Sequence, residues 1–309
     1  MSKVSVIIPN YNHAKYLKQR IDSVLNQTYQ DFDVIILDDS STDESKTIIE
    51  QYRDHPKVKI YYNQQNSGSV FKQWKKGIDF ATGKYIWIAE SDDYCEKTFL
   101  EELISKLEAN NKCVIAYAQS YVINDNNEIF WHSSHKKLFE YVNGITFIKN
   151  YMLYGVSIFN ASMAIFKKEV FYEISDRYTT FKACGDWLFW IELAQKGDVC
   201  ISAKLLNYFR KNTASVSNTS YQSGYNYIEE LNLLNFLKED KIINEKEFKD
   251  VLLSKFLRYY SSKKQISTNH KKLIDDLFYQ NKSYSFYLHK NALLNLIKKQ
   301  LKFYLKKLK

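Results

Sequence analysis

The first ninety residues alternate short apolar runs with segments of helical periodicity. Apolar runs at 4–9, 32–39, 58–63 and 84–90 are predicted strands, and the first of them is too apolar to leave one face of a sheet in water. Between the first two runs, Leu17, Ile21 and Val24 form the apolar stripe of a predicted helix over 14–27. Strands that alternate with helices predict a mainly parallel sheet covered by helices on both faces, an α/β fold of three layers.

The pattern is less regular after residue 113 and changes again near residue 212. Further elements are predicted as strands at 113–123 and 205–211, a strand running into a helix at 162–171, and a helix at 185–197. The polar stretch 212–224 is a predicted linker. Helical patterns follow it around 225–240, 244–262, 271–280 and 288–309. We therefore expect an α/β domain over 1–215 and an α-helical C-terminal region over 216–309.

Charge is divided unevenly between these two regions. Residues 1–215 hold 26 basic and 26 acidic side chains, whereas residues 216–309 hold 18 basic and 9 acidic ones. The net charge of +9 therefore lies in the C-terminal region, where eight lysines follow the last acidic residue, Asp276. This asymmetry indicates a basic segment that contacts phosphate groups of a lipid or a nucleic acid.

The segment 291–309 combines these lysines with an apolar stripe. The stripe contains Leu294, Ile297, Leu301, Tyr304, Leu305 and Leu308. This profile is typical of a helix in a membrane interface, so we expect 291–309 to bind an anionic membrane surface. The alternative is a helix packed on the C-terminal region with its lysines in water. No nucleic-acid-reading module accompanies the charge, so nucleic acid is not the expected partner.

The chain shows no export or membrane-spanning signal. It begins without a signal-peptide layout, and no apolar run reaches the ~18 residues of a transmembrane helix. The four cysteines are widely spaced, without a paired metal-binding pattern, and are expected to be free thiols. We expect a cytoplasmic protein, peripheral on the inner face of the cell membrane.

Polar and acidic residues stand at the ends of three of the predicted strands. They are the PNYN run at the end of the first strand, Asp38 and Asp39 at the end of the second, and Glu90, Asp92 and Asp93 at the end of the fourth. Because ligands of open α/β sheets bind beyond the carboxyl ends of the strands, these residues are expected to converge on one site. Crowded carboxylates are costly unless donors or a cation compensate them, and Mg²⁺ and Mn²⁺ prefer oxygen ligands. The alternative for each strand end is a turn whose acidic residue caps the next helix.

Three segments together resemble family 2 glycosyltransferases, which have the GT-A fold. They are VSVIIPNYNHAKYLKQRIDSVLNQTYQDFDVIILDDSSTDES, NSGSVFKQWKKGIDFATGKYIWIAESDDY and GDWLFWIELAQKG. The resemblance covers roughly residues 3–215 and implies a Rossmann-like α/β/α catalytic domain that binds a nucleotide sugar. The implied activity is inverting transfer of a sugar from a nucleotide-diphosphate donor, typically a UDP-sugar, to a hydroxyl of a glycan or lipid-linked saccharide. Such reactions build bacterial cell-surface polysaccharides, including O-antigen.

The resemblance also implies roles for matching residues. Pro9 and Tyr11 would contact the nucleotide, with Tyr11 against its base. Asp38, with Asp39 beside it, would bind the nucleotide base, and Asp92 would touch the ribose. Asp93 would bind Mn²⁺ or Mg²⁺, and Asp186 would be the general base of the reaction. Three further roles are our own expectations: Glu90 orients ligands or structures the loop, Lys75 or Lys72 serves the diphosphate, and Arg210 contacts phosphate or acceptor.

The sequence departs from the commonest family pattern at a few positions. Many relatives have Asp in place of Glu90, Arg-Asn in place of Trp74 and Lys75, and His in place of Asn212. These departures motivate one alternative, a GT-A-like protein that binds the donor without turnover. A nucleotidyltransferase is a weaker alternative, because no Gly-rich basic loop follows the first strand.

Overall fold

The computed structural model describes residues 2–211, 220, 223–263, 266–280, 284–292 and 294. The chain divides into two compact units between Thr213 and Ala214. Each unit is described by itself.

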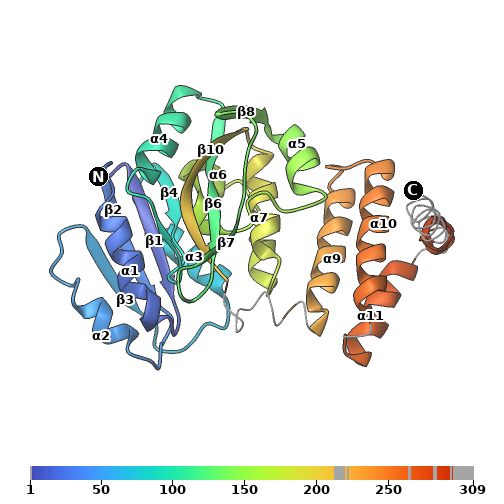
Figure 1. Cartoon of the computed structure of the whole chain (residues 1–309), viewed down its shortest axis with the longest axis horizontal. Coiled ribbons are helices and arrows are strands. Elements are labelled where there is room, and N and C mark those ends of the chain that lie inside the picture. Colours follow the sequence, from blue (N-terminus) through green and yellow to red (C-terminus); the bar gives the residue numbers. More distant parts are fainter. Residues whose placement is uncertain are drawn as a thin grey trace, which may run out of the picture. The chain divides into compact units, whose positions relative to one another are not determined.

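The first unit is built on one ten-stranded sheet (Figure 1). Its strands are β1 (Val4–Asn10), β2 (Phe32–Asp38), β3 (Val58–Tyr62), β4 (Tyr85–Ile88), β5 (Tyr94–Cys95), β6 (Cys113–Ile123), β7 (Ile129–His132), β8 (Phe139–Asn143), β9 (Ala164–Lys167) and β10 (Asp198–Arg210). The order is β3-β2-β1-β4-β9-β6-β10-β5, with β7 beside β6 and β8 beside β10. Strands β1 to β4 are parallel, and β10 is parallel to β6. The expected α/β sheet is confirmed, with antiparallel β5, β7, β8 and β9 added to it.

Helices cover both faces of this sheet, as the alternating pattern predicts. On one face lie α1 (Ala14–Leu25), α2 (Ser45–Glu50) and α4 (Phe99–Ala109), whose apolar residues join those of β1, β2 and β4 in one core. On the other face lie α3 (Val70–Phe80) and α7 (Gly185–Ala194). Gly77 of α3 allows a close approach, because a Cβ there would lie 2.4 Å from the Ile7 side chain.

Short helical segments connect the later strands of the first unit. They are α5 (Gly144–Phe147), a π-helical turn (Ile148–Met152), 3-10 turns (Ala161–Met163 and Asp176–Thr180) and α6 (Lys168–Phe171). Every residue of helix α7 except Asp186 is buried, including Trp187, Phe189 and Trp190. Phe189 packs edge-on against Trp74 and Phe166, so this helix belongs to the core rather than to the surface.

The second unit is helical, with α9 (Tyr225–Glu239), α10 (Glu245–Ser262) and α11 (Thr268–Tyr279). A capping box of Asn244 and Glu247 begins α10. Glu230 is buried, and its carboxylate accepts hydrogen bonds from Lys255 (2.7 Å) and Arg258. No helix within the described residues is long and apolar enough to cross a membrane. Most of the expected membrane-binding segment 291–309 lies outside the described residues, which include only 291, 292 and 294 of it.

Candidate active site

The carboxyl ends of β1, β2 and β4 lie side by side, because these strands are neighbours in the sheet. Asn10 at the end of β1 pairs in register with Asp38 at the end of β2. Its side-chain amide also donates a hydrogen bond of 2.8 Å to the Asp38 carboxylate. On the other side of β1, Ile7 pairs with Ile88, two residues before Glu90. The predicted convergence of three strand ends is therefore present.

Asp38 and Asp39 are buried and hold the loops around them. The Asp38 carboxylate accepts hydrogen bonds from the Ser41 backbone amide (3.1 Å) and hydroxyl (2.6 Å) as well as from Asn10. The Asp39 carboxylate accepts from the amide and hydroxyl of Ser67 at 2.7–3.1 Å and from Gln73 at 3.0 Å. Neither aspartate caps the next helix, because α2 follows Glu44.

Pro9 and Tyr11 have different surroundings at the end of β1. Pro9 is buried within the strand and pairs in register with Leu37. Tyr11 follows the strand and is 46% exposed, so its ring is available to a ligand. The next residue, Asn12, has a φ of 55°, and its side chain accepts a 2.7 Å hydrogen bond from the Thr42 amide. This bond ties the loop after β1 to the loop after β2.

The three carboxylates after β4 have three different environments. Glu90 accepts a 2.8 Å hydrogen bond from the Trp74 indole, and burial followed by the charge of Asp92 raises the pKa of Glu90 to about 8. Asp92 is partly exposed, and its carboxylate accepts no hydrogen bond from the described residues. Asp93 is 1% exposed, and burial followed by the charge of Asp92 raises its pKa. Of the three, Asp92 has the carboxylate that is open to a ligand.

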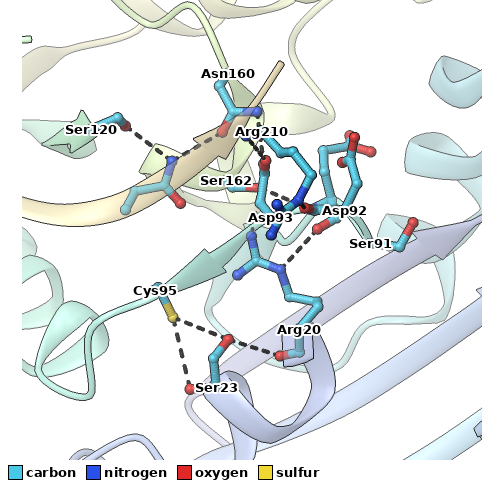
Figure 2. A network of polar contacts seen from close by, with 12 residues as sticks. Arg20, Ser23, Ser91, Asp92, Asp93, Cys95, Ser120, Asn160, Ser162 and Arg210 are labelled. Atoms are coloured by element: carbon cyan, nitrogen blue, oxygen red, sulfur yellow. Dashed lines mark hydrogen bonds and ion pairs between the residues drawn. The ribbon is translucent and has the colours of Figure 1, made fainter. Parts of the chain in front are cut away.

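Both oxygens of Asp93 are engaged inside the protein (Figure 2). One accepts a 2.8 Å hydrogen bond from the Arg210 backbone amide, and the other accepts from Asn160 (2.8 Å) and Ser162 (2.6 Å). The guanidinium of Arg20 lies 3.8 Å from the second oxygen. Asp93 is not a helix cap, because α4 begins at Phe99, several residues later. Its side chain instead connects the acidic turn to three distant parts of the first unit.

The other predicted site residues are also placed by the structure. The Lys75 ammonium lies 3.5 Å from Asp79 and 3.8 Å from Asp176, so it pairs with carboxylates outside the acidic turn. Asp186 is partly exposed in the first turn of α7 and accepts a 2.8 Å hydrogen bond from the Trp187 amide. Arg210 is 2% exposed and donates from its side chain to atoms of the protein itself.

Sequence reasoning missed several residues that contact the acidic turn, among them Arg20, Trp74 through its indole, Asn160 and Ser162. Arg20 did carry a signal, because it stands on the apolar stripe of α1, three residues after Leu17 and next to Ile21. An arginine at a core-facing position needs a buried partner. Asn160 and Ser162 gave no comparable signal, because a polar residue in or beside the short 3-10 turn Ala161–Met163 has no pattern that predicts a buried partner.

The carboxylates of this site suit a divalent metal ion that is coordinated partly by the protein and partly by a bound ligand. The described residues contain no group of three or more His, Cys, Asp or Glu side chains that would by itself hold a metal ion. Mg²⁺ and Mn²⁺ commonly bind through one or two carboxylates together with substrate phosphates. Asp92 fits that requirement, because its carboxylate is accessible and lacks a hydrogen-bond donor in the described part of the chain.

Comparison with known proteins gives one family. The model of the family described as "Glycosyl transferase family 2" matches residues 5–175, which is more than half of the chain. The glycosyltransferase GlyG of Streptococcus pneumoniae serotype 4 is 33% identical over 129 residues, covering 41% of this chain and 43% of GlyG. The poly(ribitol-phosphate) β-N-acetylglucosaminyltransferase TarP of Staphylococcus aureus is 32% identical over 199 residues, covering 62% of this chain and 57% of TarP. The chain thus matches about half the length of these relatives.

Solved structures share the fold at low sequence identity. Residues 1–349 of S. aureus TarS, crystallised with UDP-GlcNAc, align with a TM-score of 0.69 and 18% identity, covering 89% of this chain and 79% of that one. A mannosyltransferase from Pyrobaculum calidifontis, in complex with GDP-Man and Mn²⁺, aligns with a TM-score of 0.56 and 14% identity, covering 97% and 87%. These likenesses confirm the expected GT-A architecture.

Proposed function

The chain belongs to glycosyl transferase family 2, and from this premise we propose that it moves a sugar from a nucleotide-diphosphate donor to an acceptor hydroxyl. The proposed donor is a UDP-sugar, and the proposed acceptor is a glycan or lipid-linked saccharide of a cell-surface polysaccharide. The observation that carries the proposal is the meeting of three polar strand ends at one edge of the sheet, with the Asp92 carboxylate and the Tyr11 ring open there.

The nucleotide would bind over the ends of β1 and β2. Tyr11 offers an exposed aromatic face for the base. Asp38 and Asp39 fix the loops on either side, because their carboxylates bind Ser41 and Ser67. Both aspartates already accept several hydrogen bonds, so we propose that they shape the base site chiefly by holding these loops.

We propose that Asp92, rather than Asp93, is the carboxylate that faces the donor diphosphate. The Asp93 oxygens are occupied by three internal donors, whereas the Asp92 carboxylate has none among the described residues. A divalent cation, Mn²⁺ or Mg²⁺, held at Asp92 would offset the negative charge that builds on the diphosphate as it leaves.

The transfer step needs a base for the acceptor. In the proposed reaction the acceptor oxygen attacks the anomeric carbon and forms the new glycosidic bond. The bond between that carbon and the diphosphate oxygen breaks, and its electron pair leaves with the diphosphate. Asp186 takes the proton from the acceptor hydroxyl, and attack from the side opposite the leaving group inverts the anomeric centre. The partly exposed position of Asp186 at the start of α7 supports this role.

A two-stage experiment tests this proposal. A thermal-shift screen of nucleotide sugars with Mn²⁺ is expected to raise the melting temperature for one donor, because a ligand of the folded state stabilises it. That donor is then incubated with cell-surface glycan fractions, and release of nucleotide diphosphate is measured for the wild type, Asp92→Asn and Asp186→Asn. Stabilisation without release in any fraction would favour a donor-binding protein, and no stabilisation by any donor would contradict the proposal.

A further inference from the structure

Arg20 is a charged residue in an apolar position. It is 0% exposed on the core-facing stripe of α1, and its guanidinium lies 5.7 Å from the Trp87 ring centre. Its Nε donates a 2.8 Å hydrogen bond to the backbone carbonyl of Glu90. Its Nη2 lies 3.8 Å from Asp93, and neither of its terminal nitrogens has a hydrogen-bond partner among the described residues. A buried charge is costly unless it is paired, so this arginine needs Asp93 nearby.

Arg210 approaches the same turn from the end of β10. Its backbone amide donates to the Asp93 carboxylate, and its Nε donates to the Asp92 carbonyl, both at 2.8 Å. Its Nη1 donates to the Asn124 carbonyl (2.8 Å), and its Nη2 donates to Asn127 (2.7 Å). The guanidinium also lies over the Tyr16 ring, 4.4 Å from its centre. The side chain of Arg210 is therefore directed into the protein and fixed there.

We propose that Arg20 and Arg210 are positioning residues that clamp the turn 90–93 from two sides and are joined through Asp93. One guanidinium holds the carbonyl of Glu90 and the other holds the carbonyl of Asp92, so both ends of the turn are fixed (Figure 2). The Asp93 carboxylate bridges the two, because it faces the Arg20 guanidinium and accepts from the Arg210 amide. With the turn held in this way, the Asp92 side chain is the one that faces the ligand. This part of the inference rests on the proposed function.

The clamp also explains how an acidic turn is tolerated in the fold. Glu90, Asp92 and Asp93 bring three carboxylates into four positions, and two guanidinium groups lie against the same turn. Charges of opposite sign interact more strongly in the protein interior than in water. The two arginines thus stabilise the turn before any ligand arrives, and the donor meets a turn that is already in place.

Hydrogen exchange of the backbone amides tests the clamp without a ligand. The amides of Glu90 and Asp93 donate to Ser162 and to the Glu90 carbonyl, so the turn is hydrogen-bonded in the wild type. Arg20→Met is expected to speed exchange in a peptide over 89–95 about tenfold or more, as for a local opening. Arg20→Lys keeps the charge but not the planar donor group, so its exchange rate over 89–95 is expected to lie between those of the wild type and Arg20→Met.

Lys167→Met is the matched control. Lys167 is also a buried cation (8% exposed) that donates to a backbone carbonyl, that of Asn111 at 2.6 Å. It pairs with Tyr85 at the start of β4, the end of the strand remote from Glu90. This variant is expected to lower the melting temperature without changing exchange over 89–95.

A second readout is the factor by which Mn²⁺ strengthens binding of UDP, measured by calorimetry. Partners behind a metal ligand typically contribute about 10–100-fold to metal affinity, so Arg20→Met and Arg20→Lys are expected to reduce this factor about tenfold. Lys167→Met is expected to leave it unchanged. A role in stability alone would not alter this factor.

The outcomes separate the clamp from the proposed function. If Arg20→Met does not fold, Arg20→Lys carries the comparison. Wild-type exchange over 89–95 in Arg20→Lys, or equal exchange in Arg20→Met and Lys167→Met, overturns the clamp. If the wild type binds no UDP with Mn²⁺, the proposed UDP-sugar function fails, and the exchange comparison still decides the clamp.

Discussion

Replacement of Asp93 is expected to destabilise the first unit, whereas replacement of Asp92 is not. Asp93→Ala leaves the Arg20 guanidinium buried without its counter-charge, and removing one partner of a buried ion pair costs about 3–5 kcal/mol. The side chains of Asn160 and Ser162 lose their acceptor, which adds about 1 kcal/mol each. Removing the burial penalty of the Asp93 carboxylate, and its repulsion by Asp92, offsets part of this loss. We take a net loss of about 4 kcal/mol, which corresponds to a melting temperature about 10 °C lower.

Scanning calorimetry of the full chain, in buffer without metal or nucleotide, measures this effect. The Asp92 carboxylate has no donor to lose among the described residues, and its removal relieves repulsion of Glu90 and Asp93. Asp92→Ala is therefore expected to melt no more than about 2 °C below the wild type. UDP affinity should show the opposite order, with Asp92→Ala weakening binding more than Asp93→Ala does. The reason is that the Asp92 carboxylate is proposed to face the diphosphate. Equal melting temperatures for the two variants would refute the assignment of Asp93 to the interior and Asp92 to the ligand.

Three further predictions concern the ligand site and the second unit. Asp186→Asn should lower the rate of sugar transfer about 10²–10⁴-fold in a nucleotide-release assay and leave UDP affinity within about twofold, because a general base acts in the chemical step. Tyr11→Ala should weaken UDP binding about tenfold by calorimetry, and Tyr11→Phe should not, because an aromatic face is worth about 1–3 kcal/mol per stacked base. Burial opposes ionisation of Glu230, but Lys255 and Arg258 lower its pKa below the unfolded value. Stability from this group is thus present above the unfolded pKa and is lost as the pH falls through the folded pKa. At pH values below about 4.3, the melting temperature of the second unit should therefore decrease, and it should decrease less in Glu230→Gln.

The part of the fold that sequence reasoning predicted is the part with strict local periodicity. Strands β1 to β4 and the helices between them follow from alternating apolar runs and helical stripes, and parallel pairing then brings Asn10 beside Asp38. Strands β5, β7 and β8 were not predicted. They have two, four and five residues, and their pairing depends on contacts with β6 and β10 rather than on their own pattern.

The sequence predicted where the candidate site lies, but not which hydrogen bonds and ion pairs its residues make. Residues at the strand ends were identified because their position follows from sheet geometry. The partition between Asp92 and Asp93 was not accessible from spacing, since neighbouring residues in a turn point in different directions. That partition depends on Asn160 and Arg210, which follow Asp93 by 67 and 117 residues. A buried arginine on the apolar stripe of α1 was the one local sign of such a network.

The span of this network has a consequence for the order of events during synthesis. Arg20 lies in the first helix, Asp93 after the fourth strand and Arg210 at the end of the tenth, and the hydrogen bond from Arg210 to Gln19 joins residues 191 positions apart. At about 5–20 residues per second, the ribosome finishes β10 about ten seconds or more after it makes α1. From the synthesis of Asp93 until Arg210 is added, 117 residues later, the acidic turn lacks one of its two guanidinium partners. The nascent chain therefore completes the turn only when the last strand of the sheet has been added.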